Sequence, residues 1–126
     1  MSFELNFLKD RVTANFSSDV KAYEIKDAFL EIVENVNIKK IDFLMFDFTK
    51  TISYTPPKDY METLKLITLF SSTWNPQIKV AIIASEPNII MVMNEVIKLQ
   101  EEFTWEFKLF EDKVSGIKWC EKNNTK

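Results

Sequence analysis

The chain has 126 residues, a length that fits one domain over residues 1–126. Its 16 basic and 19 acidic side chains give a net charge of −3, which provides no electrostatic attraction toward nucleic acid. The sequence has no histidine, one cysteine and one glycine, which excludes histidine-based triads and metal sites, an intrachain disulfide and every glycine-rich phosphate loop. We therefore expect no cofactor and no bound metal.

We expect a cytoplasmic protein without a transmembrane segment. The first residues are neither basic nor followed by an apolar run, as they would be in a signal peptide. The longest nearly apolar stretches, such as residues 78–84, are far shorter than the ~20 residues that cross a bilayer. A lone cysteine also fits a reducing compartment.

The first 35 residues predict a β-hairpin followed by a helix. Apolar and polar side chains alternate over Phe3–Phe7 and again over Val12–Phe16, which is the period of half-buried strands. Ser17-Ser18-Asp19 offers N-cap chemistry, and apolar side chains at helical spacing follow it. This pattern predicts a helix over residues 19–35.

Two buried strands and two further helices follow. Ile41–Phe48 and Ile78–Ala84 are apolar on both faces, which is typical of parallel strands covered by helices on each side. Proline is tolerated in the first turn of a helix, so the adjacent prolines predict a helix over residues 57–72. Ser85 is the predicted N-cap of the helix over residues 87–101.

The chain closes with an edge-like strand, Trp105–Phe110, and a short helix that Asp112 is predicted to cap. The predicted order is ββαβαβαβα, an α/β fold with a mixed, mostly parallel five-stranded sheet whose first strand is antiparallel. We expect helices on both faces of this sheet. Helix 19–35 and the last helix are predicted to cover one face, and helices 57–72 and 87–101 the other.

Several marks of this pattern point to one known family. They are the opening hairpin, the central strand Ile41-Asp-Phe-Leu-Met-Phe-Asp-Phe48, the loop Thr55-Pro56-Pro57 before a helix, and the closing segment Phe110-Glu-Asp-Lys-Val-Ser-Gly-Ile-Lys-Trp-Cys120. On these marks the chain resembles, from end to end, the bacterial SpoIIAA-like (STAS-like) single-domain proteins of the STAS/SEC14-like group.

The resemblance also carries expectations about function. The anti-sigma-factor antagonists of the wider STAS group have a phosphorylated serine in an Asp-Ser-Ser-Gly turn after the central strand, and residues 47–54 lack that turn here. The resemblance therefore implies the stand-alone branch of the group. Such a protein is a non-enzymatic module that binds or carries small apolar molecules or acts through protein–protein contacts.

Two predicted helices carry more apolar side chains than one core face requires. Residues 89–93 (Ile-Ile-Met-Val-Met) are apolar on every side of a helix, which calls for cover by a partner subunit, a lipid-like ligand or a membrane surface. We expect a homodimer or a pocket for an apolar small molecule, and peripheral membrane contact stays open. The residues predicted to form this contact surface are Tyr60, Met61, Leu64, Ile90, Met91 and Met93.

An alternative hypothesis concerns Asp47. The run Asp47-Phe-Thr-Lys-Thr51 follows a buried strand and is similar to the phosphoryl-accepting motif of haloacid-dehalogenase-like phosphohydrolases. In that motif the aspartate is the nucleophile and Mg²⁺ neutralises charge on the transferred group. Thr49, Ser85 and Asp112 would join the aspartate at the carboxyl ends of the parallel strands.

A receiver-like phosphoacceptor would use nearly the same residues, with Lys113 as the phosphate-pairing base. Both hypotheses lack parts of their motifs. Position 49 is Thr where a second carboxylate would stand, and Asp19 alone replaces the acidic pair that would hold Mg²⁺. We therefore predict no catalytic residue and no hydrolytic activity.

Overall fold

The structure of the protein is a computed structural model that describes residues 3–21, 23–35, 38–55, 58–75, 77–100 and 104–122. A five-stranded sheet forms its centre, in the order β1-β2-β4-β6-β7. The strands are β1 (Phe3–Phe7), β2 (Arg11–Phe16), β4 (Phe43–Asp47), β6 (Lys79–Ile83) and β7 (Glu106–Phe110). β1 runs antiparallel to β2, and all other neighbours are parallel. The predicted mixed sheet, with its interior and edge strands, is confirmed.

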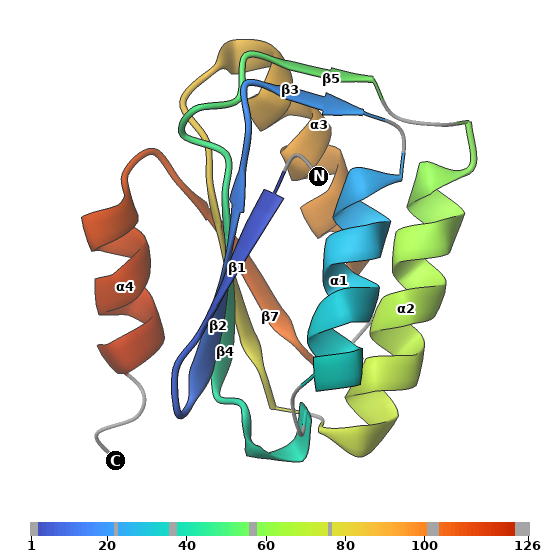
Figure 1. Cartoon of the computed structure of the whole chain (residues 1–126), viewed down its shortest axis with the longest axis vertical. Helices are drawn as coiled ribbons and strands as arrows, with labels where there is room; N and C mark the ends of the chain where they lie inside the picture. The colour runs from blue at the N-terminus through green and yellow to red at the C-terminus, as the bar shows by residue number, and fades with distance from the viewer. Residues whose placement is uncertain are drawn as a thin grey trace.

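The helices lie unequally on the two faces of this sheet (Figure 1). α1 (Glu24–Asn35), α2 (Tyr60–Trp74) and α3 (Pro87–Gln100) lie on one face, whereas α4 (Lys113–Lys122) lies on the other. A short 3₁₀ helix, η1 (Ile38–Lys40), precedes β4. The prediction that the first and last helices share a face is wrong. The parallel strands follow one another in a single direction across the sheet, so right-handed crossovers place α1, α2 and α3 on the same side.

A small two-stranded ribbon, which the sequence did not predict, crosses the end of the protein where the parallel strands finish (Figure 1). It consists of β3 (Asp19–Lys21) and β5 (Ser53–Thr55), which pair in parallel. The Ser53 hydroxyl donates a hydrogen bond to Asp19 Oδ1 at 2.7 Å. The residues predicted to cap the first helix therefore belong to the turn and strand before it, and that helix begins at Glu24.

One other helix begins later than predicted, and another begins at the predicted residue with a different cap. α2 starts at Tyr60, and the prolines at 56–57 that were expected to open it lie outside the described residues. The Glu86 carboxylate, rather than Ser85, caps α3. It accepts hydrogen bonds from the backbone N–H groups of residues 88–89, at 2.7 and 3.2 Å. Glu86 reaches these N–H groups because it is one residue closer to the helix than Ser85.

Burial on both faces distinguishes the two interior strands. Every residue of β4 and of β6 is buried. The residues that face α1, α2 and α3 are Leu44, Phe46, Val80 and Ile82. The residues that face α4 are Phe43, Met45, Ala81 and Ile83, together with Cys120 of α4 itself. Each large apolar side chain buried in this way contributes about 1.5–3 kcal/mol to folding.

α4 is capped at its start and is held against the sheet at its end. At its start, Asp112 Oδ1 accepts a hydrogen bond from the Ser115 backbone N–H at 2.8 Å, which confirms the predicted cap. At its end, Lys79 Nζ donates to the Trp119 carbonyl oxygen at 2.9 Å and lies 4.6 Å from the centroid of the Trp119 ring. The lysine thus places a positive charge at the negative end of the helix dipole.

Gly116 is the residue of α4 that allows the close approach to β6. A Cβ atom added there would lie 2.6 Å from Ile83 Cδ1, which is inside the distance of ordinary contact. A glycine at this position therefore has a packing reason, although glycine lowers helix propensity by about 1 kcal/mol relative to alanine.

We predict that Gly116→Ala lowers the free energy of unfolding by up to about 2 kcal/mol. Overpacking against Ile83 costs about 1–3 kcal/mol, and the higher helix propensity of alanine offsets about 1 kcal/mol of that cost. Ile83→Val removes Cδ1 and is the matched background. In that background Gly116→Ala should raise stability. Urea unfolding of the natural protein, the two single variants and the double variant tests the contact. An equal effect of Gly116→Ala on stability with Ile83 and with Val at position 83 would contradict it.

Candidate functional site

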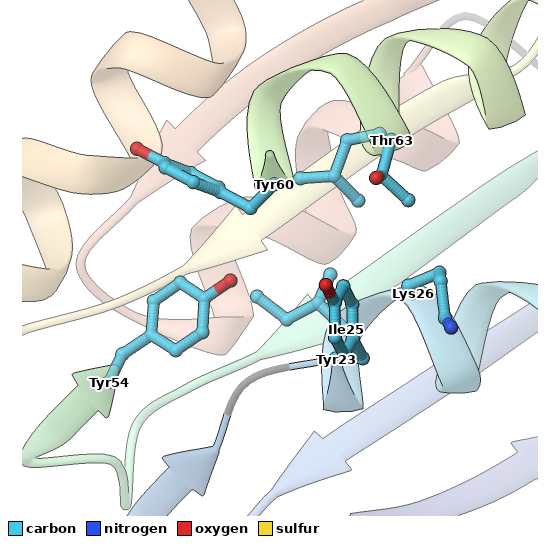
Figure 2. A pocket seen from close by; sticks show the side chains of 7 residues that line it. Tyr23, Ile25, Lys26, Tyr54, Tyr60 and Thr63 are labelled. Carbon is cyan, nitrogen blue, oxygen red and sulfur yellow. The ribbon is translucent and has the colours of Figure 1, made fainter. Parts of the chain in front are cut away.

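A cavity opens between the start of α1, the start of α2 and the strand β5, and we call it the outer cavity (Figure 2). All three tyrosines of the chain line it, although they come from three different elements. The lining residues are Tyr23, Ile25, Lys26, Tyr54, Tyr60, Thr63 and Leu64. The β3–β5 pairing positions Tyr54, because β5 is held beside β3 along its whole length.

The tyrosine hydroxyls face different surroundings. The Tyr23 hydroxyl donates a hydrogen bond to Asp59 Oδ1 at 3.1 Å. The rings of Tyr54 and Tyr60 meet edge to face, with centroids 6.3 Å apart. In Figure 2 the Tyr54 hydroxyl points toward Ile25, whereas the Tyr60 hydroxyl points toward α3. Neither of these two hydroxyls has a hydrogen-bond partner among the described residues.

All three phenols stay protonated at physiological pH. Burial raises the pKa of Tyr54 far above its usual value. Burial, followed by the nearby Glu95 carboxylate, raises the pKa of Tyr60. The hydrogen bond to Asp59 raises the pKa of Tyr23. Each tyrosine therefore offers an O–H donor rather than a phenolate.

Lys26 is the cation among the residues that line the outer cavity. Its Nζ lies 4.6 Å from the centroid of the Tyr23 ring and 3.5 Å from Asp27 Oδ1. The positive charge is therefore already matched by an aromatic face and by a carboxylate.

An inner cavity lies behind the outer one, between the sheet and the helices α1, α2 and α3. Ile25 and Leu64 line both cavities. The inner volume is about 20 Å³ and the outer about 10 Å³, so each has room for about one water molecule. Thr68 is polar, but its hydroxyl already donates to the Leu64 carbonyl oxygen at 3.0 Å. The other residues that line the inner cavity are Phe29, Phe46, Phe48, Ile82, Met93, Val96 and Phe107.

The alternative site at Asp47 lies at the opposite face, where β4 ends beside the start of α4. The Asp47 side chain is 9% exposed, and its Oδ1 accepts hydrogen bonds from the Thr49 N–H at 2.9 Å and the Thr49 hydroxyl at 2.7 Å. Lys113 Nζ lies 4.0 Å from Asp47 Oδ2. Ser85 and Asp112 are exposed. In the described part of the chain, no three Cys, Asp or Glu side chains are grouped so that they could hold a metal ion.

Cys120, the chain's cysteine, is fully buried on the side of α4 that faces the sheet. Burial raises the pKa of its thiol to about 12. At neutral pH the sulfur is therefore a protonated thiol with no access to solvent, and it packs as an apolar side chain rather than acting as a nucleophile.

Comparison with known proteins addresses the fold. No protein-family model matches the sequence, and no curated protein matches it. Among solved structures, the chain is similar to an uncharacterized protein from the DUF3478 family with a SpoIIAA-like fold, from Shewanella loihica PV-4. The TM-score is 0.57 at 15% sequence identity, with 94% of this chain and 91% of that chain covered. This chain has a SpoIIAA-like fold. The predicted fold class is confirmed, and at this identity the likeness concerns the fold alone.

The SpoIIAA-like fold brings three of the predicted contact residues to the two cavities. Tyr60 lines the outer cavity, Met93 lines the inner cavity, and Leu64 lies between them. Leu64 and Met93 are buried, at 7% and 3% exposure, so they can touch a guest inside the protein but not a partner on its surface.

The other predicted contact residues lie elsewhere on the same helices. Met61 and Ile90 are half-buried and pack against the core. Met91 is 59% exposed on the outer side of α3. The apolar run 89–93 is therefore covered on most sides by this chain alone. None of the helices in the described ranges is both long enough and apolar enough to cross a membrane.

Sequence reasoning missed several residues of the outer cavity. Tyr23, Tyr54 and Lys26 come from segments with no common spacing, and the ribbon that positions Tyr54 was not predicted. One signal was present in the composition: the chain has eleven phenylalanines but three tyrosines. A phenol in a chain that otherwise prefers phenylalanine indicates a position where a hydroxyl is useful.

Proposed function

We propose that the protein is a non-enzymatic, cytoplasmic binding module that takes up one small apolar molecule in its inner cavity. The observation that carries this proposal is the shared lining of the two cavities. Ile25 and Leu64 border both, so they form a partition between the surface and an apolar interior. Met93 borders the inner cavity, and its unbranched side chain can change shape around a guest.

Uptake requires the partition to move, because the closed cavities hold about one water molecule each. Burial of apolar surface would drive that movement. Each buried methylene group contributes about 0.8 kcal/mol, so a chain of about ten would contribute about 8 kcal/mol. That free energy corresponds to a dissociation constant near 1 μM before the cost of opening is subtracted.

We predict that Leu64→Ala raises the affinity for an uncharged apolar probe such as N-phenyl-1-naphthylamine, because it joins the two cavities. The same change should lower the free energy of unfolding by about 2–5 kcal/mol. Leu66→Ala is the matched control, since Leu66 lies on the same helix and is 57% exposed. Fluorescence titration measures the affinity, and near-UV circular dichroism checks that each variant is natively packed.

A natively packed Leu64→Ala protein that binds the probe no better than Leu66→Ala would contradict the partition. So would binding that fails to saturate at one probe per chain. Either result would place the probe outside the inner cavity.

A second use of α2 and α3 is self-association into a homodimer. The observation that favours it is the set of apolar side chains left on their outer surfaces: Leu66, Leu69 and Met91 are 57%, 48% and 59% exposed. Because Met91 is exposed, Met91→Asp is expected to leave the fold intact and to separate such a dimer. The two uses are compatible, since the cavity and these surfaces involve different residues.

The alternative to a binding function is phosphoryl chemistry at Asp47. The observation that favours it is the 4.0 Å separation between Lys113 Nζ and Asp47 Oδ2. The hydrogen bonds from Thr49 give Asp47 another role, because they close the turn after β4.

We predict no Mg²⁺-dependent turnover of a generic aryl phosphate above the background rate. Asp47→Asn, which keeps the size of the side chain, is the matched variant. Turnover by the natural protein that disappears in Asp47→Asn would instead support the phosphohydrolase.

A further inference from the structure

The outer cavity differs in chemistry from the inner one that it adjoins. Its lining includes hydroxyl groups from Tyr54 and Thr63 that have no hydrogen-bond partner among the described residues. The Tyr54 ring is half-buried, and its hydroxyl points toward Ile25 (Figure 2). An unpartnered hydroxyl beside a cavity can form a hydrogen bond with a polar group that a guest places there.

The charges around the outer cavity disfavour an anionic guest. Lys26 is already paired with Asp27 at 3.5 Å and lies over the Tyr23 ring, so its charge is not left for an anion. An anion would meet the carboxylate of Asp59, which binds the Tyr23 hydroxyl, and that of Glu95, which raises the pKa of Tyr60. The chemistry that matches is an uncharged hydroxyl or carbonyl group.

We infer that the ligand is an uncharged amphipathic molecule, with a hydroxyl or carbonyl head group in the outer cavity and an apolar chain in the inner one. This inference rests on the proposed function and adds the chemical class of the ligand. Tyr54 binds the head group through its hydroxyl. The chain passes between Ile25 and Leu64, which border both cavities, and ends near Met93.

The test compares three probes with the same chain: 1-octanol, octanoate and 1-chlorooctane. Each displaces N-phenyl-1-naphthylamine from the full-length protein in a fluorescence titration. We expect 1-octanol to bind at least about tenfold more tightly than octanoate, because burying an anion beside carboxylates is unfavourable. We expect it to bind about fivefold more tightly than 1-chlorooctane, which lacks the hydrogen bond.

Tyr54→Phe isolates the head group, since it keeps the ring and removes the hydroxyl. It should weaken 1-octanol binding about fivefold and leave 1-chlorooctane binding unchanged. Ser72→Ala is the control, because it removes a hydroxyl from α2 that lies outside both cavities, and it should leave both affinities unchanged. Thermal melting of both variants shows whether they are folded.

Two results would overturn the inference and leave the proposed function standing. One is equal affinity for all three probes with no effect of Tyr54→Phe, which would mean that the head group is not recognised. The other is tighter binding of octanoate that is lost in Lys26→Gln, which would mean an anionic ligand. Failure of the fluorescent probe and of all three octyl compounds to bind would contradict the proposed function itself, and the inference with it.

Discussion

Two neighbouring strands that are buried on both faces determine how the rest of this protein is built. β4 and β6 present apolar side chains to each side of the sheet, so both sides need cover. The strands β2, β4, β6 and β7 follow one another in one direction, so the three connecting helices all lie on one side. The described chain then offers only α4, with 10 residues, for the other side.

The α4 side meets this demand through close contact and through long basic side chains. Gly116 lets the helix lie against Ile83, and Lys79 ties the end of the helix to the sheet. Arg11 extends this cover, because its guanidinium lies 4.1 Å from the centroid of the Phe43 ring and bonds Glu121 at 2.8 Å. The aliphatic stems of these basic residues bury apolar surface that a longer helix would otherwise cover.

The three-helix side has the opposite problem, because it must fill a larger volume. Aromatic and methionine side chains fill most of it. One small cavity is left between the sheet and the three helices, and another where α1 and α2 begin. The β3–β5 ribbon closes this end and brings Tyr54 beside Tyr60. The candidate site thus arises between the three helices and the sheet, and its polar end lies where the ribbon meets the helices.

The sequence was sufficient to predict the sheet but not the faces or the ribbon. Double-sided apolar runs identify β4 and β6 reliably, because few other structures bury every residue of a strand. The faces depend on strand order, which local periodicity does not contain, and this is why α1 was assigned to the side of α4. The ribbon escaped prediction because its strands, 19–21 and 53–55, are too short for alternation to be visible. Tyr60, Leu64 and Met93 were found through their apolar excess, whereas the position of Tyr54 depends on that ribbon.

The central claim is that this protein holds a guest molecule between its three helices and the sheet. Native mass spectrometry of freshly purified protein tests it most directly. Denaturing extraction and mass analysis of whatever is released should follow. The account predicts one small apolar molecule per chain, present in the native spectrum and released on denaturation, whether the protein is a monomer or a dimer. A ligand-free monomer across micromolar concentrations, which also fails to take up an added apolar probe, would contradict it.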